Sequence, residues 1–425
     1  MTRNVILGAG VAGLGAAYAA RQRGLETVVY EAAARAGGLL DNFTVEGFRF
    51  DTGVHLSFAT EPEVRAVFDR TPYHEHAAES LCWDDGFWLR HPVQNNLYAL
   101  PAADKVALIA GLAETPQGEI ANYRDWLVHQ YGLPIAARWP LVYTEKYWTL
   151  PAEQLGTDWI GKRMRRADMR EVLRGAFSAD TPSTYYIDKM RYPKQGGYRA
   201  FIEPLIAEAN ISYGHAVTHI DAAARTVGFA NGATAAYDAL VSTLPLPQLV
   251  AMMDNAPDDI REAASSLFAT SMDLISVGFR RPDVPPSLWF YIYDRAIAAA
   301  RAYAPSIKAP SNVPEGCSSL QFEIYSSHHK PQTLSPEQLK RNIVDGLKSM
   351  KLAESEDILF VHHKHVPLAN VVFDLGMETR RDRVRDWVEA QGIALAGRFG
   401  LWDYLWSNQA MMSGLRAAER FPPAQ

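Results

Sequence analysis

The sequence predicts an α/β fold that combines a dinucleotide-binding domain, an inserted helical domain and an antiparallel-sheet domain. A buried strand at Asn4–Leu7 runs directly into the glycine-rich turn 8–13 and then into a helix. Apolar residues at helical spacing fill 102–131 and 152–175, and alternating apolar runs follow from about residue 272. At 425 residues the chain is long enough for two or three domains.

The glycine-rich turn has the spacing of a Rossmann-type dinucleotide site. Gly8 permits the tight turn, Gly10 lets the backbone approach a pyrophosphate, and Gly13 lets the helix pack closely on the strand. The helix N-terminus offers unpaired N–H groups to the phosphates. Glu31, which follows the second strand at 26–30, is placed to accept hydrogen bonds from a ribose 2′-hydroxyl. This acid argues against a 2′-phosphate.

The residues after Glu31 indicate which dinucleotide is bound. Arg35 and Gly37-Gly38 resemble the ExxxRxGG extension of the flavin amine oxidase and UDP-galactopyranose mutase superfamily. Residues 48–55 resemble the second flavin-contacting turn of that superfamily. The resemblance therefore implies a Rossmann-type FAD-binding domain. The residues expected to bind FAD are Gly8, Gly10, Gly13, Glu31, Arg35, Gly37, Gly38, Leu39, His55, Val217, Arg398, Asn408 and Gln409.

The FAD-binding domain is predicted to be discontinuous. It is expected to comprise residues 1–90, 190–271 and 370–425, with a helical domain at 91–189 and an antiparallel-sheet substrate domain at 272–369. Strands of the substrate domain are expected at Leu274–Phe279, Leu288–Tyr293, Ser318–Tyr325 and Leu359–Val366, with a helix near 336–349.

Residues 303–316 contain three prolines and a glycine, which indicates a long mobile loop. Two interpretations of this loop stay open: an active-site lid and a plain surface loop.

Further segments are similar to the UDP-galactopyranose mutases, and more to the eukaryotic type than to the short bacterial one. Residues 91–96 resemble that family's YPFQNN, 143–148 its YNxKxW and 157–163 its WLGERV. Tyr291 and Arg301 keep the spacing of a substrate-side Tyr and Arg. Residues 397–404 with Asn408-Gln409 resemble the closing GRFGxWxY…NQ segment.

The resemblance implies a flavin-dependent nucleotide-sugar mutase. In that family N5 of reduced FAD attacks the anomeric carbon, and pyranose and furanose interconvert without net redox. Arg163 and Arg301 would meet the departing diphosphate, because a guanidinium is always charged and forks onto phosphate oxygens. His55 would contact the flavin. The substrate-binding residues that the resemblance implies are Gln94, Trp148, Tyr291, Tyr404, His91 and Asn370. NAD(P)H is a possible external reductant.

Four departures from the family pattern lie on the substrate side. His91 stands where the family has Tyr, and Val93 where it has Phe. Thr144 replaces an Asn, and Asn370 falls where a diphosphate-binding Tyr is expected. A nucleotide sugar other than UDP-galactopyranose is therefore the expected substrate.

Two other interpretations stay open. The first is an FAD-dependent oxidoreductase of the amine oxidase, protoporphyrinogen oxidase or desaturase type, against which the two arginines argue because unpaired guanidinium beside an apolar substrate is costly. The second is a non-catalytic FAD-binding partner protein.

Bulk properties exclude several classes of protein. The net charge of −6 gives no basic field for nucleic acid, and no apolar run reaches the roughly 20 residues of a membrane span. Only Cys82 and Cys317 are present, and the first strand starts close to Met1, so a cytoplasmic protein without a signal peptide is expected. The oligomeric state is left open.

No metal site is expected. His328-His329 and His362-His363-Lys364-His365 are rich in histidine, and His363 and His365 would share one face of a strand. No Cys, Asp or Glu is expected to complete a ligand set, so an exposed strand is the interpretation.

Overall fold

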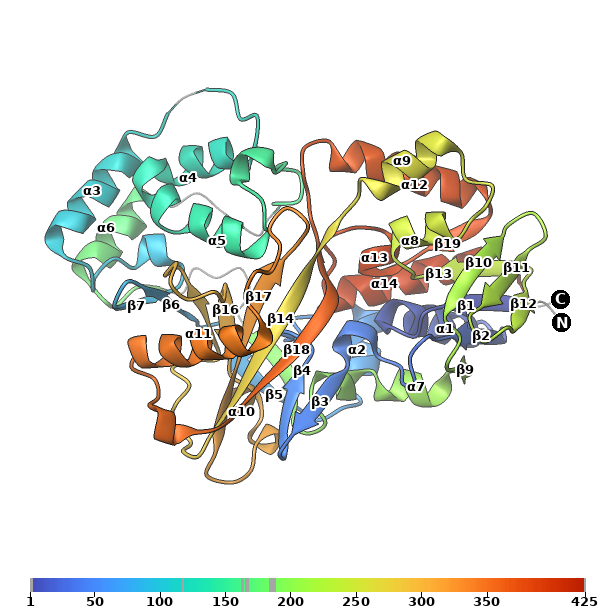
Figure 1. Ribbon diagram of the computed structural model, residues 1–425, viewed down its shortest axis with the longest axis horizontal. Helices are drawn as coiled ribbons and strands as arrows, with labels where there is room; N and C mark the ends of the chain where they lie inside the picture. Colours follow the sequence, from blue (N-terminus) through green and yellow to red (C-terminus); the bar gives the residue numbers. More distant parts are fainter. Residues whose placement is uncertain (1–2, 117, 162–163, 165–167, 183–188, 424–425) are drawn as a thin grey trace.

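A five-stranded parallel sheet organises one half of the molecule in the computed structural model, which describes residues 3–116, 118–161, 164, 168–182 and 189–423. The strands in spatial order are β9 (Ile211–Ser212), β2 (Thr27–Tyr30), β1 (Asn4–Leu7), β13 (Ala239–Ser242) and β19 (Ile393–Leu395). Every neighbouring pair is parallel. Segments from both ends and the middle of the chain therefore build one sheet, as a discontinuous Rossmann-type domain requires (Figure 1).

Close helix packing holds the first and last parts of this domain together. Helix α1 (Val11–Gln22) lies against α14 (Ser407–Ala417). A Cβ on Gly414 would stand 1.9 Å from the backbone oxygen of Ala12, and one on Gly15 would stand 2.9 Å from the oxygen of Met411. Only glycine fits at such a helix crossing, so these residues let the C-terminal helix close the domain.

A seven-stranded sheet forms the centre of the molecule (Figure 1). Its strands in spatial order are β18 (Ile358–Val371), β14 (Ala269–Phe279), β17 (Ser318–Ser326), β16 (Arg301–Tyr303), β15 (Trp289–Ile292), β6 (Leu81–Asp84) and β7 (Phe87–Arg90). Neighbouring strands are antiparallel except β15 and β6. Helix α11 (Pro336–Ser349) covers one face, where Leu339, Ile343 and Leu347 share an apolar core with Ile275 and Val277.

The structure corrects one boundary of the predicted domains. Residues 81–90 were assigned to the FAD-binding domain, but β6 and β7 extend the seven-stranded sheet, since Leu81–Trp83 pair with Phe290–Ile292. The four strands expected in that sheet and its helix are present, and the short strand β16 was missed.

The prediction of a mobile loop at 303–316 is wrong. The segment contains helix α10 (Pro305–Lys308) and the 3-10 turn Pro310–Asn312. Lys308 and Asn312 are both 0% exposed. The prolines therefore shape a packed connection, because they fix φ at the starts of two short helical turns.

The helical domain lies at the opposite end of the molecule from the parallel sheet (Figure 1). Its helices are α3 (Ala102–Ala113), α4 (Tyr123–Arg138), α5 (Pro140–Tyr147) and α6 (Met169–Phe177). The other helices are α2 (Pro62–Phe68), α7 (Glu203–Glu208), α8 (Leu246–Ala251), α9 (Asp258–Ser265), α12 (Met377–Ala390) and α13 (Gly397–Gly400). The other strands are β3 (Asn42–Val45), β4 (Phe48–Asp51), β5 (Tyr73–Ala77), β8 (Lys189–Pro193), β10 (Val217–Asp221), β11 (Thr226–Phe229) and β12 (Thr234–Ala236). In the described ranges, none of the helices has the length and apolar character to traverse a bilayer.

Candidate functional site

A cleft of about 450 Å³ is lined by residues of both large sheets. The parallel sheet contributes the glycine-rich turn after β1 and Glu31 after β2. The seven-stranded sheet contributes Met272, Tyr291, Arg301 and Glu323. One side of the cleft is therefore mostly backbone, and the other carries charged and aromatic side chains.

The glycine-rich turn has the geometry that its spacing predicts. Gly8 has a φ of +96°, and a Cβ there would stand 2.2 Å from Thr243 Oγ1. A Cβ on Gly13 would stand 1.9 Å from the Gly8 backbone oxygen, so α1 packs tightly on the turn. A Cβ on Gly10 would meet no atom within 4 Å, because Gly10 faces the open cleft. The space at Gly10 fits a pyrophosphate, which is what an FAD-binding turn must leave open.

Glu31 fixes the turn and lines the cleft. One carboxylate oxygen accepts the Ala9 N–H at 2.7 Å, and the other accepts the Ala33 N–H at 2.9 Å. Each carboxylate oxygen can accept a second bond, so the ribose contact predicted for Glu31 is compatible with this geometry. Val217, the first residue of β10, lines the same end of the cleft.

The segment after β2 divides into cleft residues and a surface arginine. Gly37, Gly38 and Leu39 line the cleft, and the Gly37 N–H donates to the Ala9 oxygen at 2.9 Å. Gly37 and Gly38 have φ values of +131° and +56°, which favour glycine. Arg35 points elsewhere: its Nη2 lies 2.9 Å from Asp41, and its side chain is 54% exposed. Arg35 was predicted to bind the cofactor, but its side chain does not line the cleft.

Asn408 and Gln409 also lie outside the cleft, contrary to expectation. The Asn408 amide donates to both Glu61 oxygens, at 2.8 and 3.1 Å. The Gln409 side chain accepts the Trp406 N–H at 3.0 Å and caps α14. The helix turns its other face to the cleft, which is lined by Trp406, Ser407 and Ala410.

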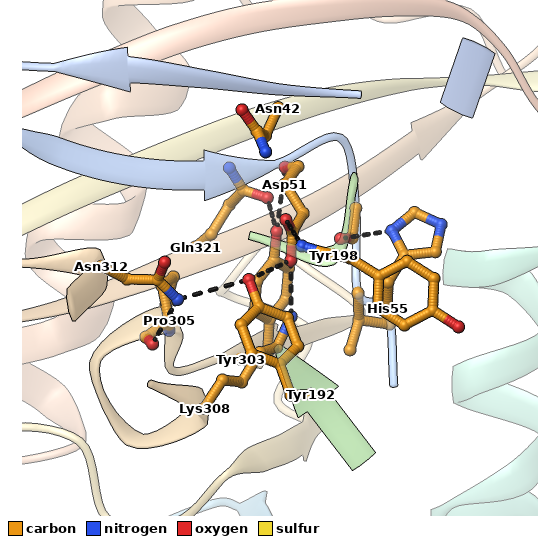
Figure 2. Close-up of polar contacts among 12 residues, drawn as sticks. Asn42, Asp51, His55, Tyr192, Tyr198, Tyr303, Pro305, Lys308, Asn312 and Gln321 are labelled. Atoms are coloured by element: carbon orange, nitrogen blue, oxygen red, sulfur yellow. Dashed lines mark hydrogen bonds and ion pairs between the residues drawn. The ribbon is translucent and has the colours of Figure 1, made fainter. Parts of the chain in front are cut away.

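The turn after β4 brings His55 to the cleft (Figure 2). His55 Nδ1 lies 3.1 Å from the Gly53 oxygen, and the ring stacks on Tyr198 with the ring centres 5.1 Å apart. Burial lowers the pKa of His55 to about 4, although Asp51 opposes that shift. His55 is therefore a neutral imidazole near pH 7.

A buried ion pair lies at the base of this turn (Figure 2). The Asp51 carboxylate accepts the Tyr192 hydroxyl at 2.8 Å and the Tyr198 N–H at 3.0 Å, and it pairs with Lys308 Nζ at 3.2 Å. Both charged side chains are at most 1% exposed. Lys308 Nζ also lies 4.0 Å from the centre of the Tyr303 ring. The segment misread as a mobile loop thus anchors the turn that carries His55.

Arg301 stands on the opposite wall, and strand register explains its surroundings. It lies opposite Tyr291 on β15 and Glu323 on β17. Its Nε pairs with Glu323, and its Nη2 donates to the Tyr325 hydroxyl at 3.3 Å. Burial acts to lower the pKa of Arg301, but Glu323 and neighbouring tyrosines raise it well above its ordinary value, so the guanidinium stays charged.

Glu323 connects this wall to the flavin turn. The residue is 0% exposed. One oxygen accepts the Tyr325 hydroxyl at 2.7 Å, and the other accepts the Val54 N–H at 2.8 Å. A single carboxylate therefore positions both Arg301 and the backbone just before His55.

The closing segment supplies a second cationic group. Arg398 donates to the Asn370 side-chain oxygen at 3.0 Å and to the Leu405 backbone oxygen at 2.9 Å. Its guanidinium lies 5.2 Å from the Tyr404 ring centre. Tyr404 in turn shares a hydroxyl–hydroxyl bond of 2.9 Å with Tyr147. Asn370, Arg398, Tyr404 and Tyr147 all line the cleft.

Three predicted substrate residues do not line the cleft. Trp148 is 3% exposed and packs edge-on against Tyr404, while the preceding Tyr147 reaches the cleft instead. The His91 ring packs against Tyr291 in a tilted arrangement with ring centres 4.7 Å apart, and burial lowers the pKa of His91 to about 4. Gln94 lies in the 3-10 turn Val93–Asn95, away from the cleft lining.

Arg163 lies outside the described residues. Sequence reasoning missed Tyr147, Glu323, Tyr325 and Lys308. The last three lie in segments whose residue types are ordinary for a sheet or a loop. Only strand pairing and chain packing reveal their roles.

The histidine-rich strand also differs from expectation. Asp273 of β14 lies opposite His365, and its Oδ1 lies 2.7 Å from His363 Nε2 and 2.9 Å from His365 Nδ1. An acid from the neighbouring strand therefore accompanies the two histidines. Over the described ranges, no group of three or more His, Cys, Asp and Glu side chains is arranged to hold a metal ion.

The fold and cleft define the class of this protein as a Rossmann-type dinucleotide-binding flavoprotein. A sequence model of the NAD(P)-binding Rossmann-like domain matches residues 6–71. The model of the flavin containing amine oxidoreductase family matches residues 132–421, more than half of the chain. The chain belongs to the flavin-containing amine oxidoreductase family.

Relatives place the chain within that superfamily. A crystal structure of reduced UDP-galactopyranose mutase has a TM-score of 0.92 and 27% identity, and the match covers 99% of this chain and 93% of that one. Putrescine oxidase bound to putrescine has a TM-score of 0.68 at 17% identity over 98% of both chains, which shows the shared fold. The chain lies in the UDP-galactopyranose mutase-like branch, and its cofactor is FAD.

A curated relative matches over a short segment. Protoporphyrinogen oxidase 2 of Arabidopsis thaliana is 42% identical over 67 residues, which are 16% of this chain and 13% of that protein. The chain therefore matches only a small part of the length of this relative.

Proposed function

We propose that this protein is a flavin-dependent mutase that interconverts the pyranose and furanose forms of a nucleotide sugar without net redox. The observation that carries the proposal is the position of Arg301, a charged guanidinium in the cleft wall beside Tyr291, Tyr325 and Tyr147. Such a group suits a leaving diphosphate, which needs a fixed cation and hydroxyl donors. The similarity to UDP-galactopyranose mutase supports the same role.

The chain's own residues would hold the flavin. Gly10 and the α1 N-terminus suit the pyrophosphate, Glu31 suits a ribose, and the turn at His55 suits the isoalloxazine ring. Reduced FAD would supply the nucleophilic N5 of the reaction. NAD(P)H is the proposed source of its electrons.

On the substrate wall, Arg301 would bind the diphosphate oxygens. Glu323 would keep the guanidinium oriented while leaving its terminal nitrogens toward the tyrosines. The bonded hydroxyls of Tyr147 and Tyr404 would donate to the same diphosphate or to the sugar. His55, neutral near pH 7, would contact the flavin without adding a second charge.

We further propose that the nucleotide is not bound as in a UDP-galactopyranose mutase. The tilted His91 ring packs against Tyr291 and so covers part of a ring beside Arg301. That packing uses an aromatic surface that could otherwise receive a base. A nucleotide sugar other than UDP-galactose is the substrate that this arrangement favours.

The test is an anaerobic assay with dithionite-reduced holoenzyme and a panel of nucleotide sugars, with products resolved by chromatography and NMR. We expect an isomeric product at constant flavin reduction, and no product with oxidised flavin. NADPH in place of dithionite should support the same turnover. Turnover only with oxidised flavin, together with consumption of oxygen, would favour an amine oxidase-type oxidoreductase and overturn the proposal.

A further inference from the structure

Lys146 is a buried lysine whose hydrogen-bond partners are all backbone oxygens. It lies near the end of α5 and is 7% exposed. Its Nζ lies 3.0 Å from the Ile292 oxygen, 2.6 Å from that of Asp294, 2.8 Å from that of Ile297 and 3.1 Å from that of Ala299. We call these four carbonyls the carbonyl cage.

The carbonyl cage resembles a coordination shell more than a set of ordinary hydrogen bonds. An ammonium group has three N–H donors, so four close oxygens surround it as they would surround a metal cation. Carbonyl oxygens that converge on one point repel each other, and rings of them bind monovalent cations in proteins. A cation at the centre of the cage offsets this repulsion.

The caged loop joins the two strands that carry the substrate wall. It runs from the last residue of β15 to just before β16, and it thereby connects Tyr291 to Arg301, which face each other across those strands. Lys146 comes from the helical domain, next to Tyr147, and the Arg301 guanidinium lies 5.3 Å from the centre of the Tyr147 ring. The cage thus ties α5 to the strands beside it (Figure 1).

We propose that Lys146 is a positioning residue that acts as an internal monovalent cation, holding the 292–299 loop so that Arg301 faces Tyr147. Removal of its side chain leaves a site of the right chemistry for ammonium. The positioning role rests on the proposed function, whereas the cation site does not.

Charges around the cage set the conditions for a test. Burial lowers the pKa of Lys146 to about 7; Lys330 and Arg295 act in the same direction, and Asp294 opposes them. Assays at pH 6 therefore keep the native lysine protonated.

The first experiment measures thermal unfolding of the Lys146→Ala holoenzyme at pH 6 and constant ionic strength. Ammonium chloride should recover at least half of the Tm that the substitution loses, and tetramethylammonium chloride should recover none, because that ion is too large for the cage. The matched control is Lys330→Ala. Lys330 also contacts α5, but it is exposed and donates to one carbonyl, that of Glu145 at 3.0 Å. It should show no preference between the two salts.

A second variant covers the case in which Lys146→Ala fails to fold. Lys146→Gln places an amide in the cage, so it should fold and should not respond to ammonium. A folded Lys146→Gln protein with the same Tm in both salts supports the cage, and an ammonium-specific gain in Lys146→Gln would overturn it. Equal responses of Lys146→Ala to both salts, or insolubility of both Lys146 variants in ammonium chloride, would overturn it.

The second experiment measures the positioning role by titration with UDP as a diphosphate probe. In Lys146→Ala we expect the Kd to rise about tenfold at unchanged FAD content, and ammonium to restore it. If UDP binds no form of the protein, the positioning role is overturned; the Tm result still decides on the cation site, and the anaerobic assay with the panel of nucleotide sugars decides on the proposed function. Unchanged UDP affinity in a variant whose Tm responds to ammonium would overturn the positioning role.

Discussion

The two walls of the cleft are built from different kinds of atoms. The flavin wall (Gly8, Gly10, Glu31, Gly37, Gly38 and His55) positions mainly backbone groups, and its glycines are needed because no Cβ fits or because a ligand must approach. The substrate wall (Tyr291, Arg301, Glu323, Tyr325 and Tyr404) positions side chains through pairs formed across strands. A backbone site fixes its ligand whatever the neighbours are, whereas a side-chain site can change its ligand through one substitution.

The two walls are nonetheless joined at two buried carboxylates. Glu323 connects Arg301 to the Val54 N–H, and Asp51 connects the turn that carries His55 to Lys308, in the segment that follows β16, the strand of Arg301. Changes at these acids should therefore affect both walls, while changes elsewhere should affect only one.

The largest effect is expected where the walls share an ion pair. Lys308→Met leaves Asp51 buried without its cation, and loss of one partner of a buried pair destabilises a protein by about 3–5 kcal/mol. Urea unfolding should show this loss together with reduced FAD content. The double variant Asp51→Asn/Lys308→Met should recover part of the stability, because no charge is then left unpaired. A Lys308→Met protein as stable as the parent would contradict a structural role for the pair.

Next in size is an effect confined to the substrate wall. Arg301→Ala should lower kcat about 10²–10³-fold while FAD stays bound, because the fixed charge for the leaving group is lost. Steady-state kinetics and the flavin absorbance ratio measure the two quantities. Arg341→Ala, an exposed arginine on α11, is the control and should leave both unchanged.

Arg301→Ala also leaves the buried Glu323 carboxylate without its cation. The pair Arg301→Ala/Glu323→Gln removes that charge, so a kcat that stays low in the double variant assigns the loss to Arg301 itself. Loss of flavin from the single variant, or full activity, would contradict the placement of Arg301 at the diphosphate.

Two glycines of the turn 8–13 are expected to have different roles, Gly13 in stability and Gly10 in FAD binding. Gly13→Ala should destabilise the protein by about 1–3 kcal/mol, because its Cβ would stand 1.9 Å from the Gly8 oxygen. Gly10→Ala should leave the stability of the apoprotein almost unchanged, because its Cβ would meet no atom within 4 Å, yet it should weaken FAD binding. Differential scanning fluorimetry with and without FAD measures both. Equal apoprotein Tm losses in the two variants would show that Gly10 is a packing residue.

The same difference explains how far the sequence predicted the molecule. The α/β class, the discontinuous parallel sheet and the roles of Gly8 and Gly13 follow from local spacing, because each depends on backbone geometry within a few residues. Asn408 and Arg35 were placed in the site by motif alone, and their partners Glu61 and Asp41 turn them away.

Pairing across strands accounts for most of what was missed. Glu323 and Asp273 become informative only once register sets them opposite Arg301 and His365. Lys308 was hidden in a segment whose prolines resemble those of a loop. No local pattern states which buried acid a distant lysine will meet, so these contacts required the three-dimensional structure.

The smallest effect concerns pH and tests both walls at once. Burial lowers the pKa of His55 in the flavin wall and of His91 behind the substrate wall to about 4, from an ordinary 6.5. The folded protein then binds these protons more weakly than the unfolded chain does, so stability should fall as the pH drops from 6.5 toward 4. Between pH 6.5 and 5.5 each group contributes at most about 1.4 kcal/mol.

The Tm measured at pH 7, 6.5, 6 and 5.5 gives the slope of stability against pH. His91→Phe keeps an aromatic ring packed against Tyr291 and removes one titrating group, so its slope should be shallower than that of the parent. The slope of His55→Gln should likewise be shallower than that of the parent, because this variant lacks the other titrating group. A slope that is the same in all three proteins would mean that neither imidazole is held neutral by its wall, and acid sensitivity would then have to arise from buried pairs such as Asp51 and Lys308.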